Sequence, residues 1–195
     1  RFSKSTACAR KSKLGIMAKL QFGTTHELAT VPNIPLIANI FDKANYVREN
    51  KVRGFMGCWN FGNMLTANTA AFNYFLTGPE HKSKELALEA FANKYIPGCD
   101  AKKAAAAWMK FSKAMDNYPF SIPFLYASPI NYTLSFPIKP QQADDVPCGR
   151  SWLLDKVRGD NLEASLGPYT LDEVIKGLGK VAEEWQNGLL VFEEA

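Results

Sequence analysis

The 195-residue chain lacks the sequence features that mark several common kinds of site. Its four cysteines are widely spaced, form no Cys-x-x-Cys pair and have only two histidines to join them, which argues against a zinc cluster. A Gly-rich phosphate loop is also absent, because Gly54, Gly57 and Gly62 do not fit the G-x-G-x-x-G spacing and no Gly-Lys-Ser/Thr run occurs. We therefore expect no metal, no cofactor and no bound nucleotide.

Long apolar runs are missing as well. No stretch of about eighteen apolar residues occurs, and the N-terminus carries charge where a signal peptide would be apolar, so we expect no membrane span. With 47% hydrophobic residues the chain does not need disulfides, and reduced cysteines are the default expectation. The cellular compartment stays open between the cytoplasm and export.

The net charge of +4 comes partly from a basic opening segment without acidic residues. Its members are Arg1, Lys4, Arg10, Lys11 and Lys13. The segment fits either an arm that binds nucleic acid or a helix end with lysines facing water. We favour the second interpretation, and no nucleic-acid partner, because no basic stripe with interleaved aromatic residues follows.

Strand and helix patterns alternate in the first part of the chain. Period-two alternation predicts the first strand, and a short, mostly apolar run predicts a second strand buried on both faces of a parallel sheet. Three-and-four spacing predicts a helix after each strand, the second one stopped by Gly78-Pro79. In order, the predicted elements are a strand at 14–22, a helix at 36–47, a strand at 52–59 and a helix at 67–76.

From residue 83 onward the apolar spacing is helical. It predicts helices over 83–95 and 100–118, the second capped by Asp100. Seven prolines between 119 and 168 predict a packed, extended strap. The capping box Thr170-Leu171-Asp172-Glu173 then begins a last helix with apolar residues at close to heptad spacing.

Polar and aromatic residues follow both predicted strands. In parallel α/β folds ligands bind at the carboxyl ends of strands, so these residues form the candidate site. A carboxylate beside a histidine, with an indole on the neighbouring strand end, supplies an ionisable group, a hydrogen-bond partner and a flat face for a sugar ring. The candidates are Glu27 and His26 as catalytic residues and Trp59, Asn60, Asn63 and Gln21 as substrate contacts.

Three of these residues also have an ordinary structural explanation. A role as an exposed loop residue or as a helix cap explains Glu27 as well as a catalytic role does. Trp59 beside a buried strand is more often part of a core, and His26 is more often a loop histidine with satisfied hydrogen bonds. Their position on adjacent strand ends is what favours a shared site.

Two groups of residues carry a resemblance to a known family. The first comprises 18–21, 25–27, Val31-Pro32, Pro35, Gly54, Met56, 58–60 and Gly62, and the second comprises Ala107-Trp108, Phe111-Ser112, Ala114, 118–120, Tyr126 and Pro129. The first group resembles the last two strand-helix units of large bacterial glycoside-hydrolase-like (β/α)₈ proteins. The second resembles the helical region that follows such barrels, so the resemblance covers most of the chain.

This resemblance implies an α/β, helix-rich fold. Residues 1–78 would be the last two βα units of an incomplete (β/α)₈ barrel, and 79–195 a helical C-terminal extension with the strap at 119–168. It also implies a nucleophile at Glu27, an aromatic contact at Trp59 and an acid/base on a strand absent from the chain. Two βα units cannot close a barrel, so the resemblance implies a carbohydrate-acting fragment completed by the remainder of a larger polypeptide.

Two further interpretations stay open. One is a non-catalytic module that binds carbohydrate or another protein through its aromatic residues. The other is a self-contained helical domain in which the two strands are only a minor ribbon.

Overall fold

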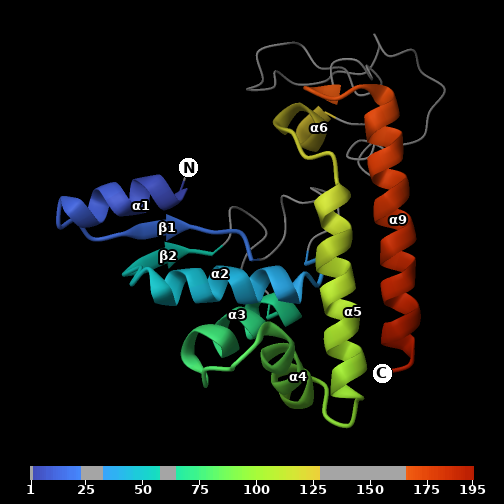
Figure 1. The fold of residues 1–195 in the computed structure, drawn as a ribbon, viewed down its shortest axis with the longest axis horizontal. Coiled ribbons are helices and arrows are strands. Elements are labelled where there is room, and N and C mark those ends of the chain that lie inside the picture. Colours follow the sequence, from blue (N-terminus) through green and yellow to red (C-terminus); the bar gives the residue numbers. More distant parts are fainter. Residues whose placement is uncertain (1, 23–32, 58–64, 128–165) are drawn as a thin grey trace.

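The computed structural model describes residues 2–22, 33–57, 65–127 and 166–195 (Figure 1). In chain order its elements are α1 (Phe2–Lys11), β1 (Met17–Lys19), α2 (Ile37–Glu49), β2 (Gly54–Met56), α3 (Ala67–Thr77), α4 (Lys84–Tyr95), α5 (Ala101–Ala114), the 3₁₀ helix η1 (Met115–Asn117), α6 (Ile122–Ala127) and α9 (Leu171–Glu193).

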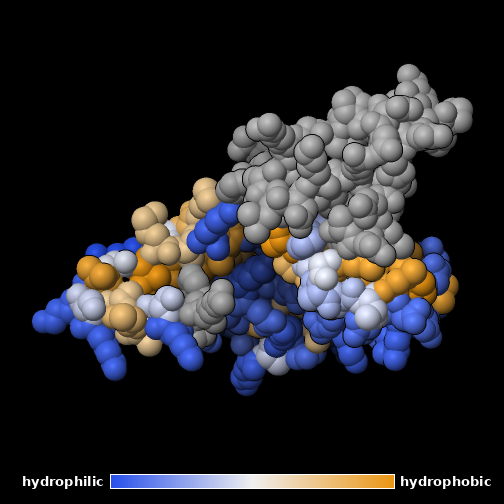
Figure 2. All heavy atoms as spheres, turned by 90° about the horizontal axis from the view of Figure 1, so that it is seen from above, coloured by the Kyte–Doolittle hydropathy of each residue, from blue (hydrophilic) through white to orange (hydrophobic). Residues whose placement is uncertain are grey.

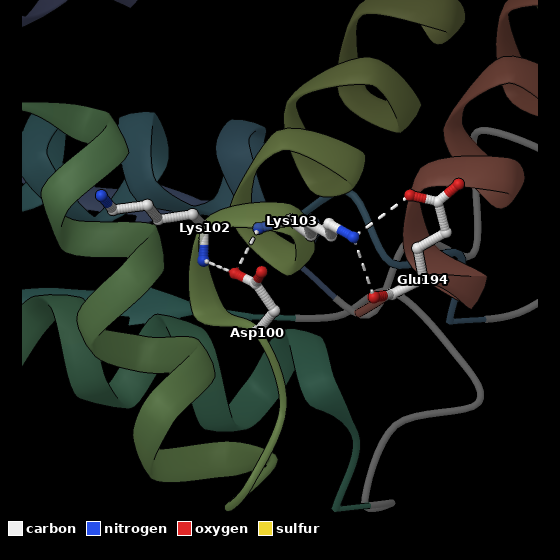
Figure 3. Close-up of polar contacts among 4 residues, drawn as sticks. All are labelled: Asp100, Lys102, Lys103 and Glu194. Atoms are coloured by element: carbon white, nitrogen blue, oxygen red, sulfur yellow. Dashed lines mark hydrogen bonds and ion pairs between the residues drawn. The ribbon is translucent and has the colours of Figure 1, made fainter.

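Helices α5 and α9 lie side by side and run in opposite directions (Figure 1). The start of α5 meets the end of α9, where the backbone N–H of Asp100 donates to the carbonyl of Ala195 at 2.6 Å. An ion pair of 3.2 Å between Lys103 Nζ and Glu194 Oε2 joins the same ends (Figure 3). Asp100 Oδ1 also accepts from the backbone N–H groups of Lys102 and Lys103 at 3.1 and 3.2 Å, which confirms Asp100 as the cap.

The main core lies among α2, α3, α4 and α5, and α9 packs against it along α5. Trp108 is 2% exposed, and its ring centroid lies 5.6 Å from that of Phe91 on α4 and 6.5 Å from that of Phe192 on α9. Phe111 stacks on Trp185 of α9 at 4.4 Å. Buried residues on both sides of residue 78 thus belong to one core.

Strands β1 and β2 pair in parallel, with Ala18 opposite Phe55. The backbone ladder continues beyond the strands, because Phe22 N–H donates to Gly57 O at 3.1 Å. The Phe22 ring then stacks on Phe72 of α3 at 4.2 Å. A Cβ at residue 57 would lie 1.9 Å from this ring, so the close approach of Phe22 requires glycine there.

The predicted fold class is wrong. The order of strands and helices between 14 and 78 and the parallel pairing are as predicted, but each strand has only three residues and the described chain holds one two-stranded sheet in a mainly helical structure. It does not form the last two βα units of an incomplete (β/α)₈ barrel. The interpretation of a helical domain with a minor ribbon describes this architecture.

The burial of the strand residues explains why the strand patterns led to a wrong fold prediction. Ala18 is 4% exposed whereas Met17 is 78% exposed, so alternation in β1 reflects one covered face. Phe55 and Met56 are 39% and 49% exposed, and the predicted burial of the second strand on both faces is therefore also wrong. Strands of a barrel are covered on both faces, and here the core is made by helices instead.

Local signals located the helices well. Thr66, Ser83 and Thr170 cap α3, α4 and α9 through hydrogen bonds to backbone N–H groups, and Gly78 ends α3 as predicted. The strap predicted as extended begins instead with the short helix α6, whose first turn tolerates Pro123. Residues 128–165 of the strap lie outside the described part of the chain.

Two glycines of α9 should respond oppositely to alanine. A Cβ at Gly188 would lie 2.6 Å from Phe111 Cε1, whereas a Cβ at Gly179 would meet no atom within 4 Å. We expect Gly188→Ala to lower the free energy of unfolding by about 1–3 kcal/mol through overpacking. Gly179→Ala should raise it by about 1 kcal/mol, because alanine is the better helix former. Urea unfolding of both variants measures this, and equal effects would contradict the α5–α9 packing.

Candidate functional site

Most of the residues predicted for the site fall outside the described structure. His26 and Glu27 lie in 23–32, and Trp59, Asn60 and Asn63 lie in 58–64. Their roles stay predictions. Gln21 is described, and it lines a pocket.

This Gln21 pocket has a volume of about 370 Å³, within the range usual for small-molecule sites. Three segments contribute to it: the end of the β1 ladder, the first turn of α2, and the chain from the end of α5 to residue 120. Its lining residues are Gln21, Leu36, Asn39, Met115, Asp116, Tyr118 and Phe120.

The backbone on both sides of Gln21 is fixed. Leu20 N–H donates to Met56 O at 2.8 Å, and Phe22 N–H donates to Gly57 O at 3.1 Å. Lys43 Nζ, one turn beyond Asn39 on α2, donates to the carbonyl of Gln21 itself. The ladder and α2 together therefore hold Gln21 at the pocket.

Helix α9 packs behind the opposite wall of the pocket, which is formed by residues 115–120. Gly177 of α9 packs closely on this wall, since a Cβ there would lie 2.7 Å from Asn117 O. Tyr169, just before α9, donates its hydroxyl to Phe120 O at 3.0 Å. Tyr118, 8% exposed, packs with Phe124 and with Val174 of α9. Asp116 and Tyr118 are thus presented by a packed segment.

Three polar side chains of the pocket have no protein partner within the described residues. These are the carboxamide of Asn39, the carboxylate of Asp116 and the hydroxyl of Tyr118. Beside them Phe120 is 49% exposed. Polar groups that converge on a cavity without protein partners are available to a ligand.

Burial raises the pKa of Tyr118 from 10.0 to about 12. Desolvation disfavours the charged phenolate, so the hydroxyl stays protonated even in the pH range where an exposed tyrosine ionises. In the pocket it can therefore donate a hydrogen bond as well as accept one.

Sequence reasoning did not identify these three residues as site residues. Asn39 and Asp116 were not singled out, and Tyr118 was only the last residue of the predicted 100–118 helix. Tyr118 belongs to a core and to the pocket at once. The one available signal was the run 118–120, which appeared only within the family resemblance.

Other kinds of centre are not found in the described ranges. No group of three or more His, Cys, Asp or Glu residues there could hold a metal, and Cys8 and Cys99 are free thiols. None of the helices that the structure describes has both the length and the apolar character needed to cross a bilayer.

Comparisons of this chain with protein-family models, with curated proteins and with solved structures found no match. Function therefore has to be inferred from the pocket itself.

The raised pKa of Tyr118 predicts a late tyrosine titration. The folded pKa of about 12 exceeds the ordinary value of 10.0, so its contribution to stability is complete below pH 10 and is lost as the pH rises toward 12. We expect a loss on the order of 2 kcal/mol in the wild type over this range, which Tyr118→Phe should not show.

Absorbance at 295 nm would follow tyrosinate formation in the folded protein, and urea unfolding at both ends of the range would follow stability. The Tyr118→Phe variant is the control for lysine titration in the same range. A single tyrosine transition near pH 10, identical in both proteins, would contradict the burial of this hydroxyl.

Proposed function

We propose that this chain binds a carbohydrate in the Gln21 pocket. The observation that carries the proposal is the convergence of Asn39, Asp116 and Tyr118, each without a partner among the described residues, beside the exposed ring of Phe120. The two functions expected from the sequence, glycoside hydrolysis and carbohydrate binding, share this ligand class.

The chemistry of the pocket suits a sugar. A sugar ring presents hydroxyl groups that both donate and accept, and the carboxamides of Gln21 and Asn39 do the same. Asp116 accepts strongly from hydroxyl groups because it is charged. Phe120 offers an apolar face to the C–H side of a ring. The volume of about 370 Å³ suits a ligand of one or two rings better than a long polymer.

The pocket supports binding more directly than hydrolysis. Glycoside hydrolysis ordinarily needs two carboxyl groups that flank one bond, one protonated and one ionised. The described lining supplies one, Asp116. Glu27 follows Gln21 closely in sequence and is the candidate for the second, so hydrolysis is a second proposal that depends on an Asp116–Glu27 pair.

Binding is tested with a glycan array followed by calorimetry on the best soluble oligosaccharide. Asp116→Asn should weaken binding about tenfold or more, because it removes the charged acceptor and leaves the shape intact. Phe120→Ala should weaken it through the lost ring face. The matched control is Glu183→Gln, which removes an exposed carboxylate of α9 that does not line the pocket. Equal affinity of Asp116→Asn and wild type would refute this site.

Hydrolysis is tested on the same oligosaccharide. If Asp116 and Glu27 act as a pair, Glu27→Gln should abolish turnover while it retains most of the binding affinity. Product formation is measured by chromatography over long incubation with excess enzyme. Binding without turnover by the wild type would leave the binding proposal intact and remove the catalytic one.

A further inference from the structure

A second cavity lies at the other end of α2 from the Gln21 pocket. It has a volume of about 500 Å³ and is formed where the C-terminal ends of α1 and α2 meet the start of the sheet. The side chains that matter here are Arg10, Lys13, Glu49, Asn50, Lys51 and Arg53, and we call the cavity the basic pocket. Long hydrophilic side chains project from this end of the molecule (Figure 2).

The two helix ends that form the basic pocket have the same geometry. After α1, Leu14 N–H donates to Ala9 O at 2.9 Å and Lys13 N–H donates to Arg10 O at 3.0 Å. After α2, the equivalent bonds come from Val52 and Lys51, both at 3.0 Å. These are the paired hydrogen bonds of a Schellman motif, which closes a helix with one left-handed residue.

Both left-handed positions hold lysine. Lys13 has a φ of 55° and Lys51 a φ of 47°, a region that glycine adopts without steric cost. Glycine at these positions would close both helices without backbone strain. Strain of this kind is found where a side chain has a function. Both strained residues line the basic pocket.

The positive charges of the basic pocket are not neutralised by neighbouring acids. Within the described chain Arg10, Lys13, Lys51 and Arg53 form no ion pair, and Glu49 forms none either. Arg10 is held in place by a neutral partner, since its Nη2 donates to Asn50 Oδ1 at 2.9 Å. Asn50 is held in turn by Tyr46, whose carbonyl accepts from Asn50 Nδ2 at 2.9 Å.

The protein compensates only part of the positive charge in the basic pocket. Each helix C-terminus carries about half a negative charge, and Glu49 adds one more. The two helix ends and Glu49 together offset about two of the four positive charges, so about +2 remains. Interaction with the helix ends therefore accounts for only part of the positive charge. The remaining charge of about +2 equals the charge that would neutralise a dianion.

We propose that the basic pocket binds the phosphate group of a small phosphate ester. Arg10 and Arg53 are suited to bidentate contacts with phosphate oxygens, and Lys13 and Lys51 add point charges. A volume of about 500 Å³ leaves room for the organic part of the ester.

This proposal does not depend on the carbohydrate site. The 13 residues of α2 separate the two cavities, a length of about 20 Å at 1.5 Å per residue. Failure of sugar binding in the Gln21 pocket would leave the basic pocket untouched, and the reverse also holds.

The test is calorimetric titration at about pH 8, where a phosphate monoester carries close to two negative charges. Glycerol 3-phosphate and inorganic phosphate are the probes, and glycerol is the uncharged control. We expect saturable binding of both phosphates, no binding of glycerol, and an affinity about tenfold lower in Arg53→Gln. The control Lys176→Gln removes an exposed lysine of α9 and should bind like the wild type.

The Lys51→Gly variant distinguishes a role of Lys51 in phosphate binding from a role in closing helix α2. Glycine relieves the left-handed backbone, so the melting temperature should rise by a few degrees while phosphate affinity falls several-fold. Unchanged affinity in both Lys51→Gly and Arg53→Gln would overturn the proposal. Binding of a single-stranded oligonucleotide without binding of either small phosphate would also overturn it, in favour of a polymer-binding surface.

Discussion

The packing of α5 is the constraint on which the rest of the structure depends. This helix is buried against α2 and α4 on one side and α9 on the other. Its alanines allow the neighbouring helices to approach closely, and Trp108 and Phe111 fill the space between them. Because the sheet is only two strands wide, these helix contacts supply most of the apolar burial that stabilises the fold.

Both candidate sites depend on this arrangement through α2. The first turn of α2 forms one wall of the Gln21 pocket, and its last residues form part of the basic pocket. The contact of α2 with α5 places Asp116 and Gln21 on the same pocket, while α9 packs against the segment that contains Tyr118. A helical core thus positions polar groups that come from distant parts of the sequence.

The sequence-based predictions were correct for features set by residues close together in sequence and wrong for features set by residues far apart. Asp100 and Thr170 were identified as caps because a side chain that bonds a backbone N–H a few residues away is a local feature. The barrel fold was wrong because a strand pattern does not specify how many strands will pair or what covers them. Gln21 was found because it lies at the end of a predicted strand, whereas Asp116 has no local signature that separates it from any exposed helix-end residue.

The sequence by itself determined where most helices begin and end and that the two strands are joined through a helix. Hydrophobic period and capping chemistry act over a few residues and can be seen in the chain. Only the tertiary structure decided that helices rather than a sheet make the core, that Asn39 and Asp116 share a pocket with Gln21, and that Arg10 and Arg53 line one cavity. Those outcomes depend on long-range packing, in which residues far apart in sequence become neighbours because their apolar faces bury one another.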